Sequence, residues 1–193
     1  MAESQPKPPR KVVLFSGHMI DAPGRDKPRF PSDKEPIAAQ AIAVALADLH
    51  VGPDDLCICG GACGGDLLFA EAALARSSLL EIYIPFEEQT FLEKSIDFAN
   101  KDWRARYFAA KARSALHVAP EELGPLAEGE NPYERENRWM LDSALRFGAD
   151  KVDLVCLWNG EGGDGPGGAQ HMMEEVRSKG GRTVWLDTTK LWG

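Results

Sequence analysis

Residues 56–66 read LCICGGACGGD, and this stretch decides the fold. Its first four residues form an apolar run, which is typical of a short strand buried on both faces in a parallel sheet. A glycine-rich turn follows, and a segment from Asp66 to about Arg76 is predicted to be a helix. The stretch therefore predicts a strand, a tight turn and a helix, which is the repeating unit of an α/β protein.

The same order of elements recurs along the rest of the chain. Residues 12–15 (VVLF) predict a buried strand, and the helix after it is expected to begin at a capping box formed by Ser32 and Glu35 and to stop at Gly52. Further strands are predicted at 80–84, 115–118, 152–158 and 183–186, further helices at 88–99, 103–113, 133–147 and 168–179, and a polar loop at 120–132. This alternation predicts a doubly wound, mostly parallel α/β fold of the Rossmann-like kind, with helices on both faces of the sheet.

Length and composition predict one ordinary globular domain over residues 11–193. Residues 1–10 hold three prolines and almost no apolar side chains, so we expect them to form a disordered tail. The formal net charge is −8, which offers no basic footprint, and we therefore expect nucleic acid to be an unlikely partner. No apolar run reaches the roughly 20 residues of a membrane span and the start lacks a signal-peptide pattern, so we expect a cytoplasmic protein with no membrane partner.

The chain has four cysteines, at positions 57, 59, 63 and 156. Their spacing favours a reduced chain with free thiols over a disulfide framework. A closed zinc site needs four ligands, and no second cysteine pair completes the cluster at residues 57–63, so small buried thiols are the preferred interpretation. We expect no metal and no cofactor. Cys63 is predicted to be the most reactive thiol, because a helix N-terminus beside it would lower its pKa.

Ten of the 19 glycines fall in two turns, at residues 60–65 and 160–168. Both turns follow a predicted strand and precede a predicted helix, so their amides and the positive end of the helix dipole favour a phosphate ligand. Neither turn matches the GxGxxG fingerprint with its downstream acid, and neither carries the GK[ST] of a P-loop. The alternative is that both turns simply make tight corners between strand and helix.

A third loop, residues 17–25, follows the first strand and carries His18, Asp21 and Arg25 to the same edge of the sheet. The arginine could bind a phosphate or a carboxylate through its fork of donors. Asp21 or Asp66 could contact a ribose hydroxyl, and His18 is interpreted as a ligand contact and not as a catalyst. The alternative is a solvated surface loop.

Several of these segments resemble the SLOG superfamily, which contains DNA-processing protein A, the YpsA-like proteins and the lonely-guy phosphoribohydrolases. Residues 59–66 (CGGACGGD) are similar to the SGGARGxD turn of the first two branches, and residues 85–86 match the PF after their third strand. Residues 135–140 resemble the RNxxM-like segment of the YpsA-like branch. Residues 166–174 resemble the PGGxGTxxE signature of the lonely-guy enzymes. The similarity spans most of residues 11–187.

The resemblance implies a Rossmann-like fold with a nucleotide-type pocket. Two departures concern catalysis: Gln170 and His171 replace the glycine and threonine of the lonely-guy signature, and Glu136 stands where an arginine is expected four residues before Met140. The hydrolytic enzymes rely on that arginine and on the signature glutamate, which corresponds to Glu174.

We therefore expect a bacterial SLOG-like domain that senses a nucleotide or a nucleotide-derived phosphate ligand in signalling or conflict systems. The resemblance leaves one alternative open, a phosphoribohydrolase that cleaves the N-glycosidic bond of a nucleoside 5′-monophosphate, with Glu174 as its catalytic residue and His171 or Arg135 in place of the lost arginine. A module that handles single-stranded DNA is a third possibility, against which the net charge argues. Homo-oligomers and an effector partner are also expected. The residues predicted to bind the ligand are Gly17, His18, Asp21, Arg25, Gly60, Gly61, Ala62, Gly64, Asp66, Pro85, Phe86, Arg135, Asn137, Gly167, Gly168 and His171.

Overall fold

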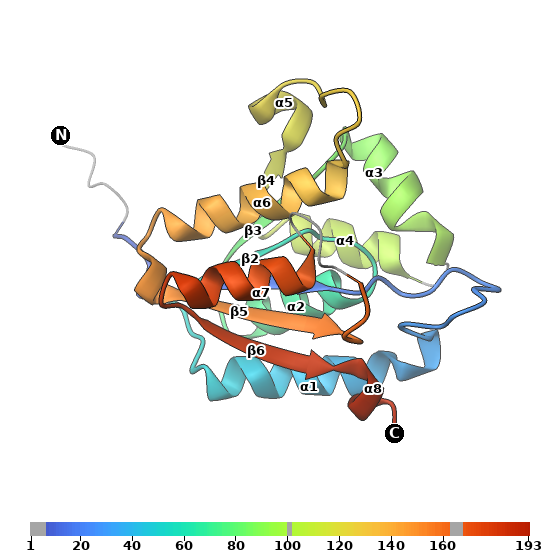
Figure 1. Cartoon of the computed structure of the whole chain (residues 1–193), viewed down its shortest axis with the longest axis horizontal. Helices are drawn as coiled ribbons and strands as arrows, with labels where there is room; N and C mark the ends of the chain where they lie inside the picture. Colours follow the sequence, from blue (N-terminus) through green and yellow to red (C-terminus); the bar gives the residue numbers. More distant parts are fainter. Residues whose placement is uncertain (1–6, 100–101, 163–167) are drawn as a thin grey trace.

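The computed structural model describes residues 7–99, 102–162 and 168–193, and these residues form one six-stranded parallel sheet (Figure 1). Its strands are β1 (Val12–Gly17), β2 (Leu56–Cys59), β3 (Leu79–Ile84), β4 (Ala115–Val118), β5 (Val152–Trp158) and β6 (Arg182–Asp187). The helices are α1 (Glu35–Asp48), α2 (Gly65–Ala75), α3 (Glu88–Ser95), α4 (Trp103–Lys111), α5 (Ala119–Leu123), α6 (Pro132–Leu145), α7 (Ala169–Ser178) and α8 (Thr188–Leu191). The doubly wound α/β fold predicted from the sequence is confirmed.

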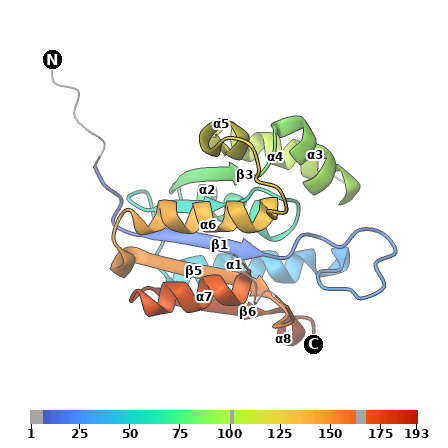
Figure 2. The same ribbon diagram turned by 45° about the horizontal axis from the view of Figure 1, so that its top comes forward.

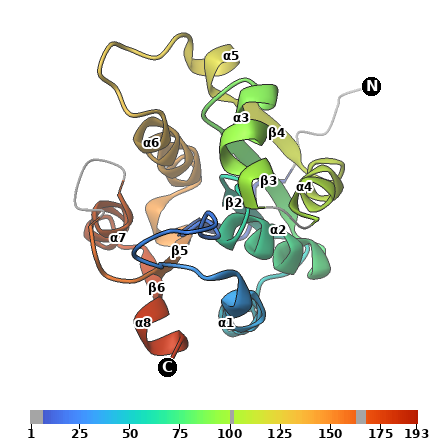
Figure 3. The same cartoon turned by 90° about the vertical axis from the view of Figure 1, so that its right-hand side faces the viewer.

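Helices cover both faces of the sheet, as Figure 3 shows. Val13 and Phe15 of β1 point to the face covered by α1, α2 and α4, while Val12 and Leu14 point to the face covered by α6 and α7. This alternation follows from the period of two along a strand. The central strands are largely apolar because each face is buried under helices.

The strand order β4-β3-β2-β1-β5-β6 places a topological switch point between β1 and β5. From β1 the chain builds β2, β3 and β4 on one side, and it then returns to add β5 and β6 on the other. In open α/β sheets the ligand crevice lies at such a point, beyond the carboxyl ends of the strands. Figure 2 shows the long loop after β1 extending from this edge of the sheet.

Three local predictions were wrong. The capping box does not form: Ser32 begins a 3-10 turn (Ser32–Lys34), α1 starts without a side-chain cap, and Glu35 instead pairs with Arg106 at 2.7 Å. The predicted polar loop at 120–132 begins within the short helix α5. The tail is also shorter than expected among the described residues, because Pro9 is buried and Arg10 pairs with the buried Asp55 at 2.6 Å. Residues 1–6 of that tail lie outside the described residues.

Gly64 is required where the loop after β1 crosses the glycine-rich turn after β2. Met19 and Gly64 form an isolated antiparallel bridge, and Gly64 has a φ of +101°. A Cβ atom at this position would lie 2.5 Å from the backbone nitrogen of Ile20. The glycine therefore permits two loops from neighbouring strands to lie against each other at the edge where the candidate site is found.

Candidate ligand pocket

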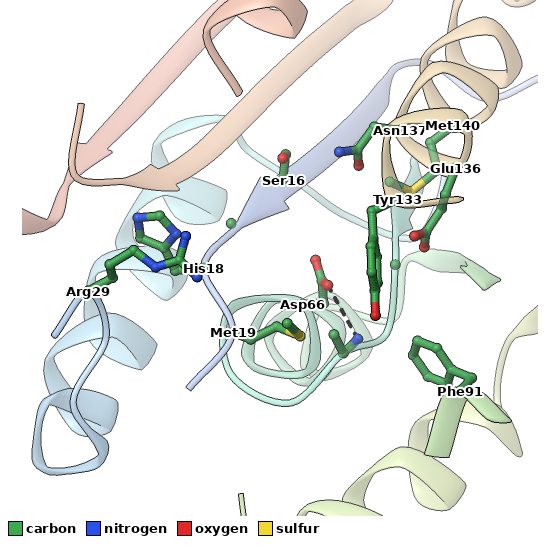
Figure 4. A pocket seen from close by; sticks show the side chains of 13 residues that line it. Ser16, His18, Met19, Arg29, Asp66, Phe91, Tyr133, Glu136, Asn137 and Met140 are labelled. Atoms are coloured by element: carbon green, nitrogen blue, oxygen red, sulfur yellow. Dashed lines mark hydrogen bonds between the residues drawn. The ribbon is translucent and has the colours of Figure 1, made fainter. Parts of the chain in front are cut away.

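A cavity of about 330 Å³ opens at the carboxyl ends of β1 and β2, between the loop after β1 and helix α6 (Figure 4). Its volume lies within the range typical of small-molecule pockets, roughly 300–1,000 Å³. A smaller hollow beside it, of about 170 Å³, reaches toward β5. The larger cavity is lined by Ser16, Gly17, His18, Met19, Arg29, Gly60, Ala62, Asp66, Phe91, Tyr133, Glu136, Asn137 and Met140.

The loop after β1 is held in shape by Asp21. Its Oδ2 atom accepts hydrogen bonds from the backbone amides of Arg29 (2.8 Å) and Phe30 (2.9 Å). The Arg25 guanidinium lies 3.4 Å from Oδ1 of Asp21, and Arg25 Nε donates to the carbonyl of Lys27. Asp21 and Arg25, both predicted as ligand contacts, therefore pair with each other and stabilise the loop, and neither lines the pocket.

Arg29, which the sequence analysis did not select, is the cation of the pocket. Its Nε atom is buried and has no hydrogen-bond partner among the described residues. Within the same residues, no carboxylate lies within ion-pair distance of its guanidinium, and burial followed by the charge of Arg25 lowers its pKa. An unpaired guanidinium in a partly buried pocket is a receptor for an anionic group.

His18 lies beside Arg29 at the switch point. Its Nε2 atom is 3.1 Å from Oδ1 of Asn159, and the backbone amide of Asn159 donates to the same nitrogen at 3.3 Å. Burial, reinforced by the charge of Arg29, lowers the pKa of His18 to about 4. The imidazole is therefore neutral near pH 7, which leaves Arg29 as the local positive charge, and the role of His18 as a ligand contact stays a prediction.

The amides of the first glycine-rich turn are used within the protein. The Ala62 amide donates to Asp66 (3.3 Å), the Cys63 amide to the carbonyl of Ser95 (2.9 Å), and the Gly65 amide to the carbonyl of His18 (3.1 Å). These donors hold the turn against α3 and the loop after β1. Phosphate binding by this turn stays a prediction, and three of its amides already have partners.

Two carboxyl groups converge above Gly60 at the base of the pocket. A Cβ atom on Gly60 would lie 2.8 Å from Oε1 of Glu136 and 3.1 Å from Oδ2 of Asp66. Burial raises the pKa of Asp66 to about 7, against the opposing effect of hydrogen bonds from the Ala62 and Gly60 amides. Burial raises the pKa of Glu136 well above its usual range, and the charge of Asp66 adds to this effect.

The wall opposite Arg29 is largely apolar and comes from α3 and α6. Tyr133 stands at its rim, and Phe91 and Met140 lie deeper. Phe86 packs edge-on against Tyr133 with ring centroids 5.6 Å apart, so it supports the wall from behind. Pro85 and Phe86, both predicted as ligand contacts, do not line the pocket. Asn137 lines the pocket as the resemblance implied.

Several predicted residues lie elsewhere. Arg135 donates to the carbonyls of Leu123 (2.7 Å) and Gly124 (3.0 Å) and so ties α6 to the preceding loop. Glu174 is exposed on α7 and accepts a hydrogen bond from Gln170, and His171 lies 3.4 Å from Glu175. These positions remove the geometric basis for Glu174 as a catalytic group of this pocket. Gly61, Gly64 and Gly168 do not line the pocket, and Gly167 lies outside the described residues.

The cysteines are free and buried, as predicted. The expectation that Cys63 is reactive is wrong, because burial and the nearby charge of Asp66 raise its pKa to about 12. Among the described residues, no group of three or more His, Cys, Asp or Glu side chains could hold a metal ion. In the same part of the chain, no helix is both long and apolar enough to cross a bilayer.

The chain resembles solved structures of DNA processing protein A. It is 15% identical to the protein from Streptococcus pneumoniae, with a TM-score of 0.42, and the match covers 95% of this chain and 61% of that one. It is 13% identical to the protein from Helicobacter pylori, again with a TM-score of 0.42, and this match covers 95% of this chain and 79% of that one. The chain thus spans less than two thirds of the pneumococcal protein. A scan of protein-family models and a search of curated proteins give no match.

These neighbours belong to the DNA-processing branch that residues 59–66 resemble, and the agreement concerns the fold alone. They also correct one expectation. The protein from Helicobacter pylori is reported with a unique single-stranded DNA binding mode. The net charge of −8 is therefore not a sufficient reason to regard nucleic acid as an unlikely partner of such a fold.

Proposed function

We propose that this chain is a sensor domain that binds a nucleotide or a nucleotide-derived phosphate ligand in the pocket between the loop after β1 and α6. The observation that carries the proposal is the guanidinium of Arg29, which lines a crevice at the switch point of the sheet and whose Nε atom has no hydrogen-bond partner among the described residues. A partly buried cation of this kind stabilises an anionic group through charge-assisted hydrogen bonds.

The opposite wall suits the remainder of a nucleotide. Tyr133, Phe91 and Met140 offer an aromatic and apolar surface for a base, and the carboxyl groups of Asp66 and Glu136 lie below it. Gly17 lies between the two walls, where the backbone of β1 ends. The ligand would therefore extend from the switch point toward α6, with its phosphate beside Arg29. We place the domain in the cytoplasm, where such ligands occur.

Calorimetric titration with nucleoside monophosphates tests this proposal. Arg29→Met should weaken binding about tenfold to a hundredfold, as loss of a charged hydrogen-bond donor does. Arg25→Met is the matched control, because Arg25 lies in the same loop and is paired with Asp21. If both variants bind as tightly as the wild type, or if no nucleotide binds, the proposed site is wrong.

The same samples separate the other candidate functions. Chromatography after overnight incubation shows whether free base is released, which would indicate a phosphoribohydrolase, and Glu174→Gln then shows whether that residue takes part. A single-stranded oligonucleotide is included beside the mononucleotides. Tight, salt-sensitive binding of the oligonucleotide with no measurable mononucleotide binding would identify the ligand as a strand and refute the small-ligand proposal.

A further inference from the structure

Glu136 is the most deeply buried carboxyl group that faces the pocket. Asn131 caps helix α6 by accepting hydrogen bonds from the amides of Tyr133 (2.9 Å) and Glu134 (3.3 Å), so the helix begins at Pro132. One turn later the Glu136 side chain points toward the sheet and is only 5% exposed. Figure 4 shows its carboxyl group directed into the pocket, on the side opposite Arg29.

No described residue donates a hydrogen bond to this carboxyl group, and its oxygens face the pocket without being fully enclosed by protein. Asp66 differs, because its carboxyl oxygen accepts from the Ala62 amide. Amide donors stabilise the ionised form of Asp66, whereas Glu136 has no such support. Of the two groups, Glu136 is therefore the one that keeps a proton.

The ionisable groups around Glu136 favour the same assignment. Asp66 faces it from α2, the Cys59 thiol from β2, and His18 and Arg29 line the far wall. Burial and the Asp66 charge raise the pKa of Glu136 well above its usual range. Burial and the neighbouring charge thus favour the carboxylic acid form of Glu136, which offers one O–H donor and one carbonyl acceptor side by side.

Gly60 leaves open the space on which the two carboxyl groups converge. Its φ is not in the left-handed region, so backbone conformation does not require glycine here. A side chain would instead fill the space, because its Cβ would lie 2.8 Å from Glu136 and 3.1 Å from Asp66. An amino group bound above Gly60 could donate one hydrogen to each carboxyl group.

We propose that Glu136 and Asp66 select an amino-bearing nucleobase, adenine or cytosine, with Glu136 pairing to the amino group and the adjacent ring nitrogen while Asp66 accepts the second amino hydrogen. Adenine and cytosine each carry an amino donor next to a ring-nitrogen acceptor, which complements a neutral carboxylic acid. Hypoxanthine and uracil carry a carbonyl oxygen instead, which would face Asp66 without a hydrogen. This inference rests on the proposed nucleotide site.

Matched ligands test the inference directly. At pH 7.5, where the Asp66 carboxyl group is mostly ionised, adenosine monophosphate should bind at least about tenfold more tightly than inosine monophosphate. Cytidine monophosphate should bind more tightly than uridine monophosphate by a similar factor. The members of each pair differ at the amino position and keep the same phosphate. Equal affinities within both pairs would overturn the base assignment while leaving the phosphate site intact, whereas failure of all four to bind would overturn both proposals.

Variants of Glu136 test whether this side chain contacts the base, because a purely structural role would not change the base preference or its pH dependence. The affinity of the wild type for adenosine monophosphate should fall as pH rises and Glu136 ionises. The amide of Glu136→Gln keeps a donor beside an acceptor but does not ionise, so this variant should retain the adenine preference and lose that pH dependence. Glu136→Met, of similar size, should fold and bind adenosine monophosphate about tenfold less tightly, because it loses both hydrogen bonds to the base. Glu134→Gln makes the same chemical change two residues away, outside the pocket lining, and should behave as the wild type. Above pH 7.5, where Asp66 is mostly ionised, a decline in affinity that persists in Glu136→Gln would refute the assignment, and so would an unchanged affinity of Glu136→Met for adenosine monophosphate.

Discussion

Replacing Asp66 with asparagine should change how the stability of the protein depends on pH. Burial raises the pKa of Asp66 from its ordinary value of 3.8 to about 7. At about 1.4 kcal/mol per pH unit, ionising this group in the folded state costs on the order of 4 kcal/mol. The amide side chain of the Asp66→Asn variant would avoid this cost, and its oxygen could still accept the hydrogen bond that Ala62 now donates to the carboxylate.

The sign follows from proton binding in the two states. A raised pKa means that the folded protein holds the proton of Asp66 more tightly than the unfolded chain does, so this contribution to stability is complete below about pH 4 and is lost as pH rises to about 7. His18 acts in the opposite sense, because its pKa is lowered from 6.5 to about 4. Its contribution is present above pH 6.5 and is lost as pH falls toward 4, at a cost of roughly 3 kcal/mol.

The pH dependences of stability that Asp66 and His18 contribute overlap and partly cancel in the wild type. The informative quantity is therefore the difference in the free energy of unfolding between Asp66→Asn and the wild type. Urea unfolding followed by the fluorescence of the five tryptophans gives the free energy of unfolding from pH 4 to pH 8. The stability of Asp66→Asn relative to the wild type should rise by on the order of 4 kcal/mol across this range. Reduced repulsion on Glu136 adds in the same direction.

A control carries the same chemical change at a solvated position. Asp26 is exposed in the loop after β1, and Asp26→Asn should alter the free energy of unfolding by no more than about 0.5 kcal/mol at any pH. A difference curve for Asp66→Asn that stays flat from pH 4 to pH 8 would show that Asp66 is solvated, and the account of the carboxyl pair would then be wrong.

Two further predictions concern the loops and the thiols. Gly64→Ala should destabilise the protein by about 2 kcal/mol or more, because a φ of +101° disfavours any other residue and the new Cβ would lie 2.5 Å from a backbone nitrogen. Gly52→Ala, with open space around it, is the control in the same urea assay, and equal effects would contradict the argument. Cys63 should react with a thiol reagent at pH 8 only as fast as the protein opens, since burial raises its pKa to about 12, and rapid labelling of the native protein would restore it as a reactive group.

The fold could be predicted from the sequence because its strands are apolar runs bounded by glycine and polar residues. Residues 56–59 were predicted with the bounds that the structure shows, and β5 likewise matches residues 152–158. Local capping was less predictable. Ser32 and Glu35 have the right spacing for a capping box, but Glu35 forms a tertiary ion pair with Arg106, 71 residues away, which no local pattern reveals.

The sequence predicted the location of the candidate site better than the residues that line it. The turns after β1 and β2 do lie at the pocket, and His18, Gly60 and Asp66 line it. Arg25 was predicted as a ligand contact and Arg29 was not, although both lie in the loop after β1, because sequence alone cannot show which arginine pairs with Asp21. Asp21 accepts from the Arg29 and Phe30 amides, which closes the loop and leaves the Arg29 side chain at the pocket.

The departure from the family pattern at Glu136 changes the charge distribution of the pocket. The resemblance implies an arginine at this position in the hydrolytic SLOG enzymes, and the structure places a buried carboxyl group there instead, while the neighbouring Arg135 binds loop carbonyls. The positive charge of this pocket comes from Arg29 on the opposite wall. A phosphate bound near α6 would face Glu136 and Asp66, whereas a phosphate at the switch point would face the guanidinium of Arg29, for which the described part of the chain supplies no carboxylate partner. On the proposed function, the charge distribution therefore sets the direction of the ligand, with its anionic end beside β1 and its base toward α6.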